Sequence, residues 1–218
     1  MKTKVLNLYA GIGGNRKLWE NVEVTAVEQN SKIAKIYSSL FPNDKIIIAD
    51  AHDYLLKHFT EFDFIWCSPP CPSHSSIRKM GCYPTKEGKI FNTPIYPDMK
   101  LYEEILLLKY YFKGEWVVEN VIPFYKPLIE AKKLQRHLFW CNFPLNEKRF
   151  EVDNTRNENL FNWAEKLGFS PFTLKLLQNN FTHSELRTIY RNCVNSYLGK
   201  YVFDMAYHVK QNKIMNYV

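Results

Sequence analysis

The residues best suited to covalent chemistry lie in the stretch 64–76, FIWCSPPCPSHSS. Residues 63–66 have the pattern of a buried strand, and two prolines then end it, because proline has no amide hydrogen for a ladder. Cys71 follows, so it should be held just past a strand end. In an open α/β sheet, ligands bind beyond the carboxyl ends of the strands. Cys71 is therefore a candidate nucleophile, although a lone cysteine is more often a small buried core residue.

The elements that position this cysteine follow from the alternation of apolar and turn-forming segments. Strands are expected at 5–9, 22–27, 45–49, 62–66, 116–118 and 135–143. Helices are expected at about 16–20, 31–40, 53–59, 98–112, 128–134 and 196–209, with Ser31 and Asp98 as caps. This β-α-β-α rhythm predicts an α/β fold with a doubly wound, mostly parallel sheet. Residues 73–97 lack periodicity and predict a long functional loop.

Three further strand ends carry residues that suit a nucleoside. The first is the glycine-rich motif at 9–14, YAGIGG, which allows a tight turn and close approach of a ligand to the backbone. The second is Glu28, which can accept both hydroxyls of a ribose. The third is Asp50, which can accept from an adenine amino group. The motif lacks the full GxGxxG spacing, and both acids could instead cap helices. Taken together, the three predict a pocket for an adenosine-bearing cofactor.

Composition sets the broad class of the protein. The chain has 218 residues, 46% of them hydrophobic, which suits one domain with a sizeable core. The net charge of +7 suits a polyanionic partner. The five cysteines form no Cys-x-x-Cys pair, so neither a metal site nor a disulfide framework is expected. The chain shows neither a signal peptide nor a membrane span, so we expect a cytoplasmic protein of prokaryotic or viral origin.

In its motifs and their order the chain resembles the DNA (cytosine-5) methyltransferases. The matching pieces are LYAGIGG at 8–14, VEQ at 27–29, AD at 49–50, PPC at 69–71, ENV at 119–121, a weaker QR at 135–136 and RNCVNS at 191–196. The resemblance covers most of residues 1–143, plus 191 to about 205. It implies the Rossmann-like fold of S-adenosylmethionine-dependent methyltransferases, with residues 1–143 and 191–218 as the catalytic domain.

The resemblance implies a reaction as well as a fold. Cys71 would add to carbon 6 of a cytosine flipped out of double-stranded DNA, Glu119 would act as an acid on ring nitrogen 3, and Arg136 would contact the carbonyl oxygen of the base. An equal alternative for Arg136 is a surface or phosphate contact. Such activity would serve DNA methylation, as in a restriction–modification system.

The implied contacts extend the site. The residues that would bind S-adenosylmethionine are Tyr9, Ala10, Gly11, Gly13, Gly14, Glu28, Gln29, Asp50, Ala51, Pro70, Asn195 and Ser196. Residues 73–97 would form a lid over DNA, with Ser73, Ser75 and Arg78 as nucleic-acid contacts. The simpler interpretation of residues 73–97 is an ordinary polar loop. The simpler interpretation of residues 195–196 is a helix cap.

The chain also departs from the family pattern. Pro72 stands where glutamine is usual, only one arginine precedes His137, and Val194 replaces a glycine. Residues 144–190, the expected target-recognition region, are short. They would form a minimal reader with phosphate contacts from Lys148, Arg149, Arg156 and Lys166, or specificity would come from a homodimer or a separate partner.

Three alternatives remain open at this stage. Ser68-Pro-Pro70 also fits amino-group methyltransferases, such as those acting on N4 of cytosine, although Cys71 stands where they carry an aromatic residue. An RNA cytosine-5 methyltransferase would use the same mechanism on a different nucleic acid. A non-catalytic DNA-binding module would need neither Cys71 nor Glu119.

Overall fold

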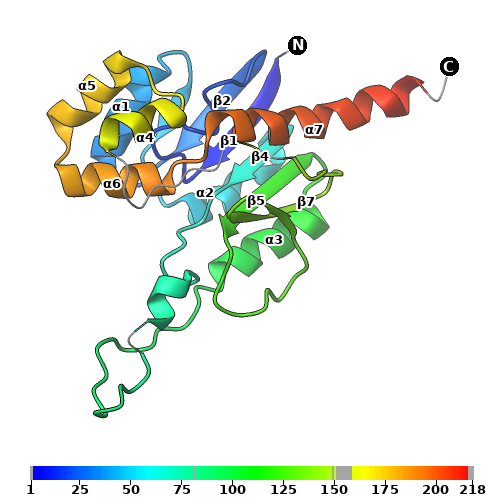
Figure 1. Cartoon of the computed structure of the whole chain (residues 1–218). Coiled ribbons are helices and arrows are strands. Elements are labelled where there is room, and N and C mark those ends of the chain that lie inside the picture. Colours follow the sequence, from blue (N-terminus) through cyan, green and yellow to red (C-terminus); the bar gives the residue numbers. More distant parts are fainter. Residues whose placement is uncertain (1, 81, 149, 151–158, 216–218) are drawn as a thin grey trace.

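The computed structural model describes residues 2–80, 82–148, 150 and 159–215, and it contains a seven-stranded sheet (Figure 1). The strands are β1 (Thr3–Leu8), β2 (Val22–Val27), β3 (Lys45–Ile47), β4 (Phe64–Cys67), β5 (Glu115–Val121), β6 (Lys132–Leu134) and β7 (His137–Cys141). Their order is β3-β2-β1-β4-β5-β7-β6. Strands β1 to β5 pair in parallel, and β7 is antiparallel to both β5 and β6. This confirms the predicted doubly wound, mostly parallel sheet.

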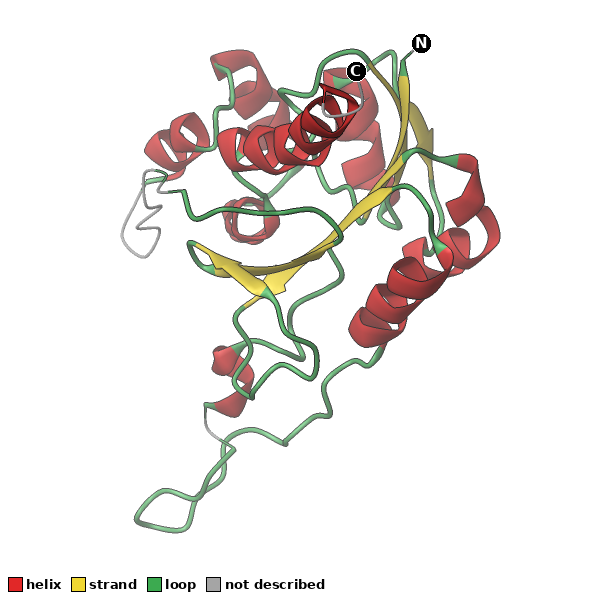
Figure 2. Cartoon of the chain, turned by 90° about the vertical axis from the view of Figure 1, so that its right-hand side faces the viewer, coloured by secondary structure: helices red, strands yellow, loops and turns green. Residues whose placement is uncertain are grey.

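Helices cover both faces of the sheet (Figure 2). They are α1 (Ser31–Leu40), α2 (Ala51–His58), α3 (Lys100–Tyr111), α4 (Leu160–Lys166), α5 (Pro171–Asn180), α6 (His183–Asn192) and α7 (Ser196–Met215), with short 3-10 turns η1 (Phe59–Glu61) and η2 (Ser76–Lys79). Helices α2 and α3 pack on one face, and α7 packs on the other. Among the described residues, no helix is long and apolar enough to cross a membrane.

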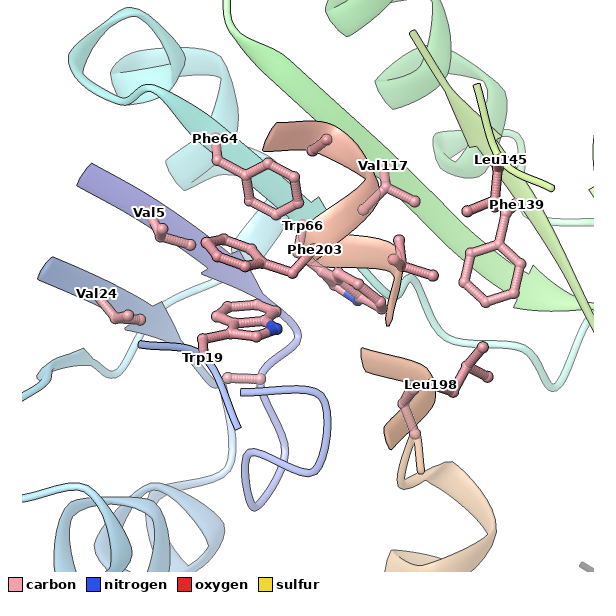
Figure 3. Close-up of a cluster of buried hydrophobic side chains, with 14 of the residues drawn as sticks. Val5, Trp19, Val24, Phe64, Trp66, Val117, Phe139, Leu145, Leu198 and Phe203 are labelled. Carbon is pink, nitrogen blue, oxygen red and sulfur yellow. The ribbon is translucent and has the colours of Figure 1, made fainter. Parts of the chain in front are cut away.

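The central strands are buried on both faces, which explains their near-continuous apolar sequence. Phe64 and Trp66 of β4 face the α7 side, whereas Ile65 and Cys67 face α2 and α3. On the α7 side, the Trp19 ring stacks on Phe203 with centroids 5.0 Å apart (Figure 3). Each fully buried ring of this kind stabilises the fold by about 2–3 kcal/mol before side-chain entropy is subtracted.

The helix expected at 16–20 is wrong, because the segment consists of turns. Buried Asn15 donates to the Asn7 side chain (2.8 Å), and the Arg16 guanidinium forms an ion pair with Asp44 (2.9 Å). The Trp19 indole enters the core and donates to the Gly199 carbonyl (3.2 Å). These long-range contacts leave the residues between β1 and β2 no room for a regular helix.

The helix expected at 128–134 is also wrong. Residues 132–134 instead form β6, which pairs with β7 across the two-residue turn Gln135–Arg136. Gln135 adopts a φ of 52°, the left-handed conformation that such a tight hairpin turn requires. Only the β7 part of the strand expected at 135–143 is present.

Helix α1 has the expected range but a different cap, and α2 and α3 each begin two residues from the expected start. Asn30, not Ser31, caps α1 by accepting from the amides of Lys32 and Ile33. Helix α2 begins at Ala51 because the Asp50 carboxylate accepts from the Asp53 amide. Asp98 accepts from the Lys100 amide (3.1 Å) at the start of α3.

The predicted recognition region, 144–190, contains α4 and α5 and most of α6; its residues 149 and 151–158, Arg149 and Arg156 included, lie outside the described residues. The three helices form their own apolar cluster around Trp163 and Leu177, and this cluster includes Ile12 of the glycine-rich segment and Ile36 of α1. The helices therefore pack beside the amino-terminal half of the sheet (Figure 1).

Residues 76–97, which we call the arm, extend away from the body of the protein (Figures 1 and 2). The arm contains η2 and otherwise has no regular secondary structure among its described residues, as the predicted long loop requires. Several large side chains on it are exposed, including Tyr83, Phe91 and Tyr96.

Candidate active site

A cavity of about 420 Å³ opens at the carboxyl ends of the parallel strands. Segments that follow β1, β2, β3 and β4 contribute to its wall, as do the last residues of β5 and the end of α6. The sequence-predicted residues that line it are Tyr9, Ala10, Gly11, Gly14, Glu28, Gln29, Asp50, Ala51, Pro70, Cys71 and Glu119. The cavity thus brings together the predicted nucleophile, the predicted acid and most of the predicted cofactor residues.

The glycine-rich segment turns sharply after β1. Tyr9 and Gly11 both have a φ of 56°, in the left-handed region, and a side chain at Gly11 would meet nothing within 4 Å. Gly14 is required for a different reason, since a Cβ there would collide with Cys193 and the Val194 carbonyl. Gly13 does not line the cavity; it has a φ of 78° and packs closely against Phe41.

The two predicted acceptors, Glu28 and Asp50, stand at neighbouring strand ends. One oxygen of Glu28 accepts from the Gly11 amide (3.0 Å), and the other accepts from the Asn30 amide (2.8 Å). Asp50 caps α2 through Asp53, and this hydrogen bond lowers the pKa of the Asp50 carboxyl. Both acids therefore hold local structure, and each carboxylate also keeps lone pairs for a ligand.

A buried polar network lies behind the glycine-rich segment, and sequence reasoning missed it. The Tyr9 hydroxyl donates to Glu104, a fully buried carboxyl of α3. His52 Nδ1 lies 3.1 Å from the same carboxyl, and its Nε2 lies 3.4 Å from Glu103. Burial raises the pKa values of Tyr9 and Glu104, while the hydrogen bond to Glu104 raises that of His52. The network fixes Tyr9 in its left-handed conformation at the cavity wall.

Cys71 lies in the loop after β4, at intermediate exposure. Its carbonyl accepts from the amides of His74 and Ser75, both at 3.0 Å, and the Asn120 side chain anchors the loop by donating to the Pro69 carbonyl (3.0 Å). Burial raises the pKa of the Cys71 thiol, the charge of Glu119 raises it further, and Arg136 opposes these effects. Glu119 and Arg136 therefore act in opposite directions on the ionisation of Cys71.

Glu119 is buried near the end of β5, with 6% of its surface exposed. Its Oε1 lies 3.5 Å from Nε2 of His137, the first residue of β7. Burial lowers the pKa of His137, and Glu119 acts in the opposite direction. His137 lines the cavity, so a histidine beside the predicted arginine belongs to the site.

Other predicted residues lie outside the cavity wall. The Asn195 side chain accepts from the amides of Tyr197 and Leu198 at the start of α7, so it fills the role of a helix cap. The Ser196 hydroxyl donates to the Leu167 carbonyl (3.3 Å). Their neighbours Cys193 and Val194 line the cavity instead. Arg136 is half-buried at the hairpin turn, and its guanidinium donates to the Arg191 carbonyl (3.4 Å).

Ser73 and Ser75 flank His74, which lines the cavity, whereas Arg78 lies on η2 in the arm. The Ser73 hydroxyl accepts from the Asp98 amide (3.0 Å), and Ser75 forms a β-bridge with Pro123. Arg78 is exposed on η2. In the predicted recognition region, Lys148 lies 4.8 Å from the centre of the Tyr201 ring, and Lys166 lines a second groove between α4 and α7.

His74 is a further cavity residue that the sequence did not single out. It is 1% exposed, and its Nδ1 lies 2.6 Å from the Tyr125 hydroxyl. Its place in the loop, three residues after Cys71, is a signal that could have been read. No sequence pattern indicated Glu104, which stands on a helix among apolar residues.

One family model matches the amino-terminal part of the chain. Residues 3–95 match the family model of C-5 cytosine-specific DNA methylases, which is fewer than half of the 218 residues. No curated protein sequence matches the chain.

Several solved structures are similar to the chain. They include an S-adenosylmethionine-dependent methyltransferase from Agrobacterium tumefaciens (14% identity, 57% of this chain and 40% of that chain, TM-score 0.38), a hypothetical protein from Thermus thermophilus (16%, 64% and 74%, 0.43) and the methyltransferase EhMeth from Entamoeba histolytica (15%, 75% and 60%, 0.39). The chain spans less than half of the Agrobacterium protein, and TM-scores below 0.5 do not by themselves indicate a function.

The chain's own geometry and the family match agree. The strand order, the cavity at the carboxyl ends of the strands and the match over residues 3–95 together identify the Rossmann-like fold of S-adenosylmethionine-dependent methyltransferases.

Proposed function

We propose that this protein transfers a methyl group from S-adenosylmethionine to carbon 5 of a cytosine in DNA, through a covalent adduct with Cys71. The observation that carries the proposal is the shared cavity. Cys71 and Glu119 follow or end the adjacent strands β4 and β5, and the glycine-rich segment, Glu28 and Asp50 line the same cavity. A nucleophile, an acid and a nucleoside pocket in one cavity are the groups that this reaction needs.

The cavity fits the cofactor. Its volume of about 420 Å³ lies in the range of small-molecule sites. Gly11 leaves the backbone open to a ligand, and the two acids line the same cavity, Glu28 as the proposed acceptor for the ribose hydroxyls and Asp50 as the proposed acceptor for the adenine amino group. Tyr9 and Ala51 add contact surface. When bound, S-adenosylmethionine supplies an electrophilic methyl group on a sulfonium.

Cys71 solves the central chemical problem, since carbon 5 of an aromatic cytosine is a poor nucleophile. The Cys71 thiolate forms a bond to carbon 6, and the π electrons of the 5,6 double bond move toward carbon 5. Carbon 5 then accepts the methyl group. A water molecule takes the proton on carbon 5; the electron pair of that bond restores the double bond and breaks the sulfur–carbon bond, which returns Cys71 as the thiolate.

Glu119 makes the addition easier. Protonated Glu119 donates to ring nitrogen 3 as negative charge develops on the ring, and it takes the proton back when Cys71 leaves. The proton therefore balances over one turnover. A donor held in a buried site acts more strongly than it would in water, and Glu119 is 6% exposed.

Double-stranded DNA is the proposed partner, with the target base flipped into the cavity. The arm begins five residues after Cys71 and carries four basic residues, Arg78, Lys79, Lys86 and Lys89, against a single acid, Glu87. Basic groups contact phosphates, and exposed aromatic rings stack on unpaired bases. Residues 144–190 remain the proposed recognition region. Because they are few, a homodimer or a separate specificity partner would complete the reading of sequence.

A product assay tests the proposal. The protein is incubated with methyl-labelled S-adenosylmethionine and either duplex DNA or tRNA, and the nucleic acid is digested to nucleosides for mass spectrometry. We expect 5-methylcytosine in DNA, and none with Cys71→Ser. Methylation on the exocyclic nitrogen of cytosine would contradict the Cys71 mechanism. 5-Methylcytosine in RNA alone would keep the mechanism and replace the substrate, and DNA binding without turnover would indicate a binding module.

A further inference from the structure

The geometry of the β6–β7 hairpin places His137, rather than Arg136, beside Glu119. Leu134 pairs with His137, so Gln135 and Arg136 form the two-residue turn. Arg136 lies at the tip of that turn and donates to the Arg191 carbonyl. His137 is the first residue of β7, opposite Val121 of β5, and lines the cavity. The imidazole, not the neighbouring guanidinium, is therefore the group built into the wall next to the acid.

The contacts of the imidazole indicate where its proton sits. Nε2 lies 3.5 Å from Glu119 Oε1, and the two side chains are 10% and 8% exposed. Nδ1 is buried without a hydrogen-bond partner among the residues that the structure describes. In a protein interior, an N–H group without an acceptor is rarer than an acceptor atom without a donor, and it costs more folding free energy. The hydrogen is therefore assigned to Nε2, the nitrogen that lies 3.5 Å from Glu119, and Nδ1 is the nitrogen without a hydrogen.

Burial favours the neutral form of His137. Burial lowers the pKa of His137, Glu119 on β5 raises it, and Arg136 in the adjoining turn lowers it. Cys71, from the loop after β4, shares the cavity, and Leu134 is the β6 residue opposite. A cation at this place would favour the ionised form of Glu119, which cannot donate a proton. A neutral imidazole leaves that donor intact.

We propose that His137 is a positioning residue for Glu119: its Nε2–H donates to Oε1, so the proton that Glu119 takes up when the base is bound is held on Oε2, the oxygen left for the base. The inference rests on the proposed function and names the group that orients its acid. As Cys71 adds to the ring, the Oε2 proton moves to ring nitrogen 3, and the Nε2–H bond stabilises the carboxylate that forms. When Cys71 leaves, the same proton returns to Oε2.

The tautomer can be measured without cofactor or DNA. The chain has six histidines, and ¹⁵N-histidine NMR of the free protein, compared with His137→Gln, identifies the His137 signals. We expect a protonated Nε2 and an unprotonated Nδ1 at neutral pH, and a His137 pKa that falls further in Glu119→Gln. The opposite tautomer, or a His137 that is charged at neutral pH, would overturn the inference. This result is independent of whether 5-methylcytosine is formed.

Activity then tests the positioning role. His137→Leu removes the donor, and we expect kcat to fall about 10²-fold with little change in KM for DNA. His137→Gln keeps a neutral N–H donor and should restore most of the loss. The matched control is His183→Gln, an exposed histidine at the start of α6, which should act as wild type. If Leu and Gln variants lose activity equally while both remain folded by thermal unfolding, the inference fails. A wild-type protein that makes no 5-methylcytosine would refute the proposed function instead.

Discussion

The two halves of the cavity differ in how far their polar groups are already satisfied. In the half built by β1, β2 and β3, both oxygens of Glu28 accept backbone amides, Asp50 caps a helix, and the Tyr9 hydroxyl donates to Glu104. Glu104 does not line the cavity, and its second oxygen, Oε2, has no hydrogen-bond partner among the described residues. In the half built by β4, β5 and β7, the buried atoms His74 Nε2 and His137 Nδ1 have no hydrogen-bond partner among the described residues.

This difference separates two tasks. The first half holds a rigid shape for a nucleoside, so its residues should control affinity and stability. The second half holds reactive groups whose interactions strengthen only as the reaction proceeds, so its residues should control kcat. Substitutions in either half of the cavity test this division.

The largest expected effect is that of Glu119→Gln. The amide cannot give a proton to the base, so we expect kcat to fall by about 10²–10³-fold while the Kd for S-adenosylmethionine stays unchanged. Turnover assays and calorimetry measure the two quantities. Glu115→Gln, at the opposite end of the same strand, is the matched control and should be active. A large loss of cofactor affinity in Glu119→Gln would contradict the assignment of separate tasks to the two halves of the cavity.

Glu104→Ala should produce the largest loss of stability. It leaves the Tyr9 hydroxyl and His52 without their buried partner, and removing one member of such a group costs about 3 kcal/mol of unfolding free energy. Urea denaturation measures it. Glu103→Gln touches the same histidine, but the Glu103 side chain is 61% exposed, so its effect should stay below about 1 kcal/mol. Equal effects of the two variants would show that the network does not hold the cofactor half.

Glu28→Ala should act on cofactor affinity. It removes an acceptor for the ribose and frees the Gly11 and Asn30 amides, so the Kd for S-adenosylmethionine should rise about tenfold or more. Saturating cofactor should restore most of kcat. Glu23→Ala, an exposed residue of the same strand, should bind normally. A kcat that stays low at saturation would assign Glu28 to the chemical step instead.

The smallest effect concerns the reactivity of Cys71 in the free protein. Because burial and the Glu119 charge raise the pKa of the thiol, alkylation by iodoacetamide should be slow near neutral pH and should accelerate as the pH rises. Glu119→Gln removes the charge and lowers this pKa, so Cys71 should react faster at a given pH. Peptide mass spectrometry follows the reaction, with Cys82 of the arm as internal reference. A slower reaction in the variant would contradict the placement of Glu119 beside Cys71.

Sequence patterns predicted the sheet well because its strands are buried on both faces and end in turn residues. The apolar runs of β1 and β4, and the proline pair before Cys71, are local signals. The helix prediction at 16–20 failed because Arg16 and Trp19 are held by partners far along the chain, Asp44 and Gly199. Local helix propensity carries no information about such partners.

The position of a cavity residue was predictable where it lies at or just after the end of a strand, as with Glu28, Cys71 and Glu119. The position of a side chain was not predictable where it depends on the register of a hairpin. A two-residue turn, with Gln135 in the left-handed conformation, shifts Arg136 to the tip and turns His137 toward the cavity. The Tyr9–Glu104 contact joins residues 95 positions apart, which no short motif can record.

Covalent trapping tests the central claim most directly. DNA in which every cytosine carries fluorine at carbon 5 requires no knowledge of the recognition sequence, and the fluorine cannot leave as a proton. After methyl transfer, the bond between Cys71 and carbon 6 should therefore persist, and mass spectrometry should find the methylated adduct on the Cys71 peptide. Wild-type protein with S-adenosylmethionine should form it, and Cys71→Ser should not. Methylation of unmodified DNA by the same preparation, with no adduct on Cys71 in the fluorinated DNA, would contradict the account.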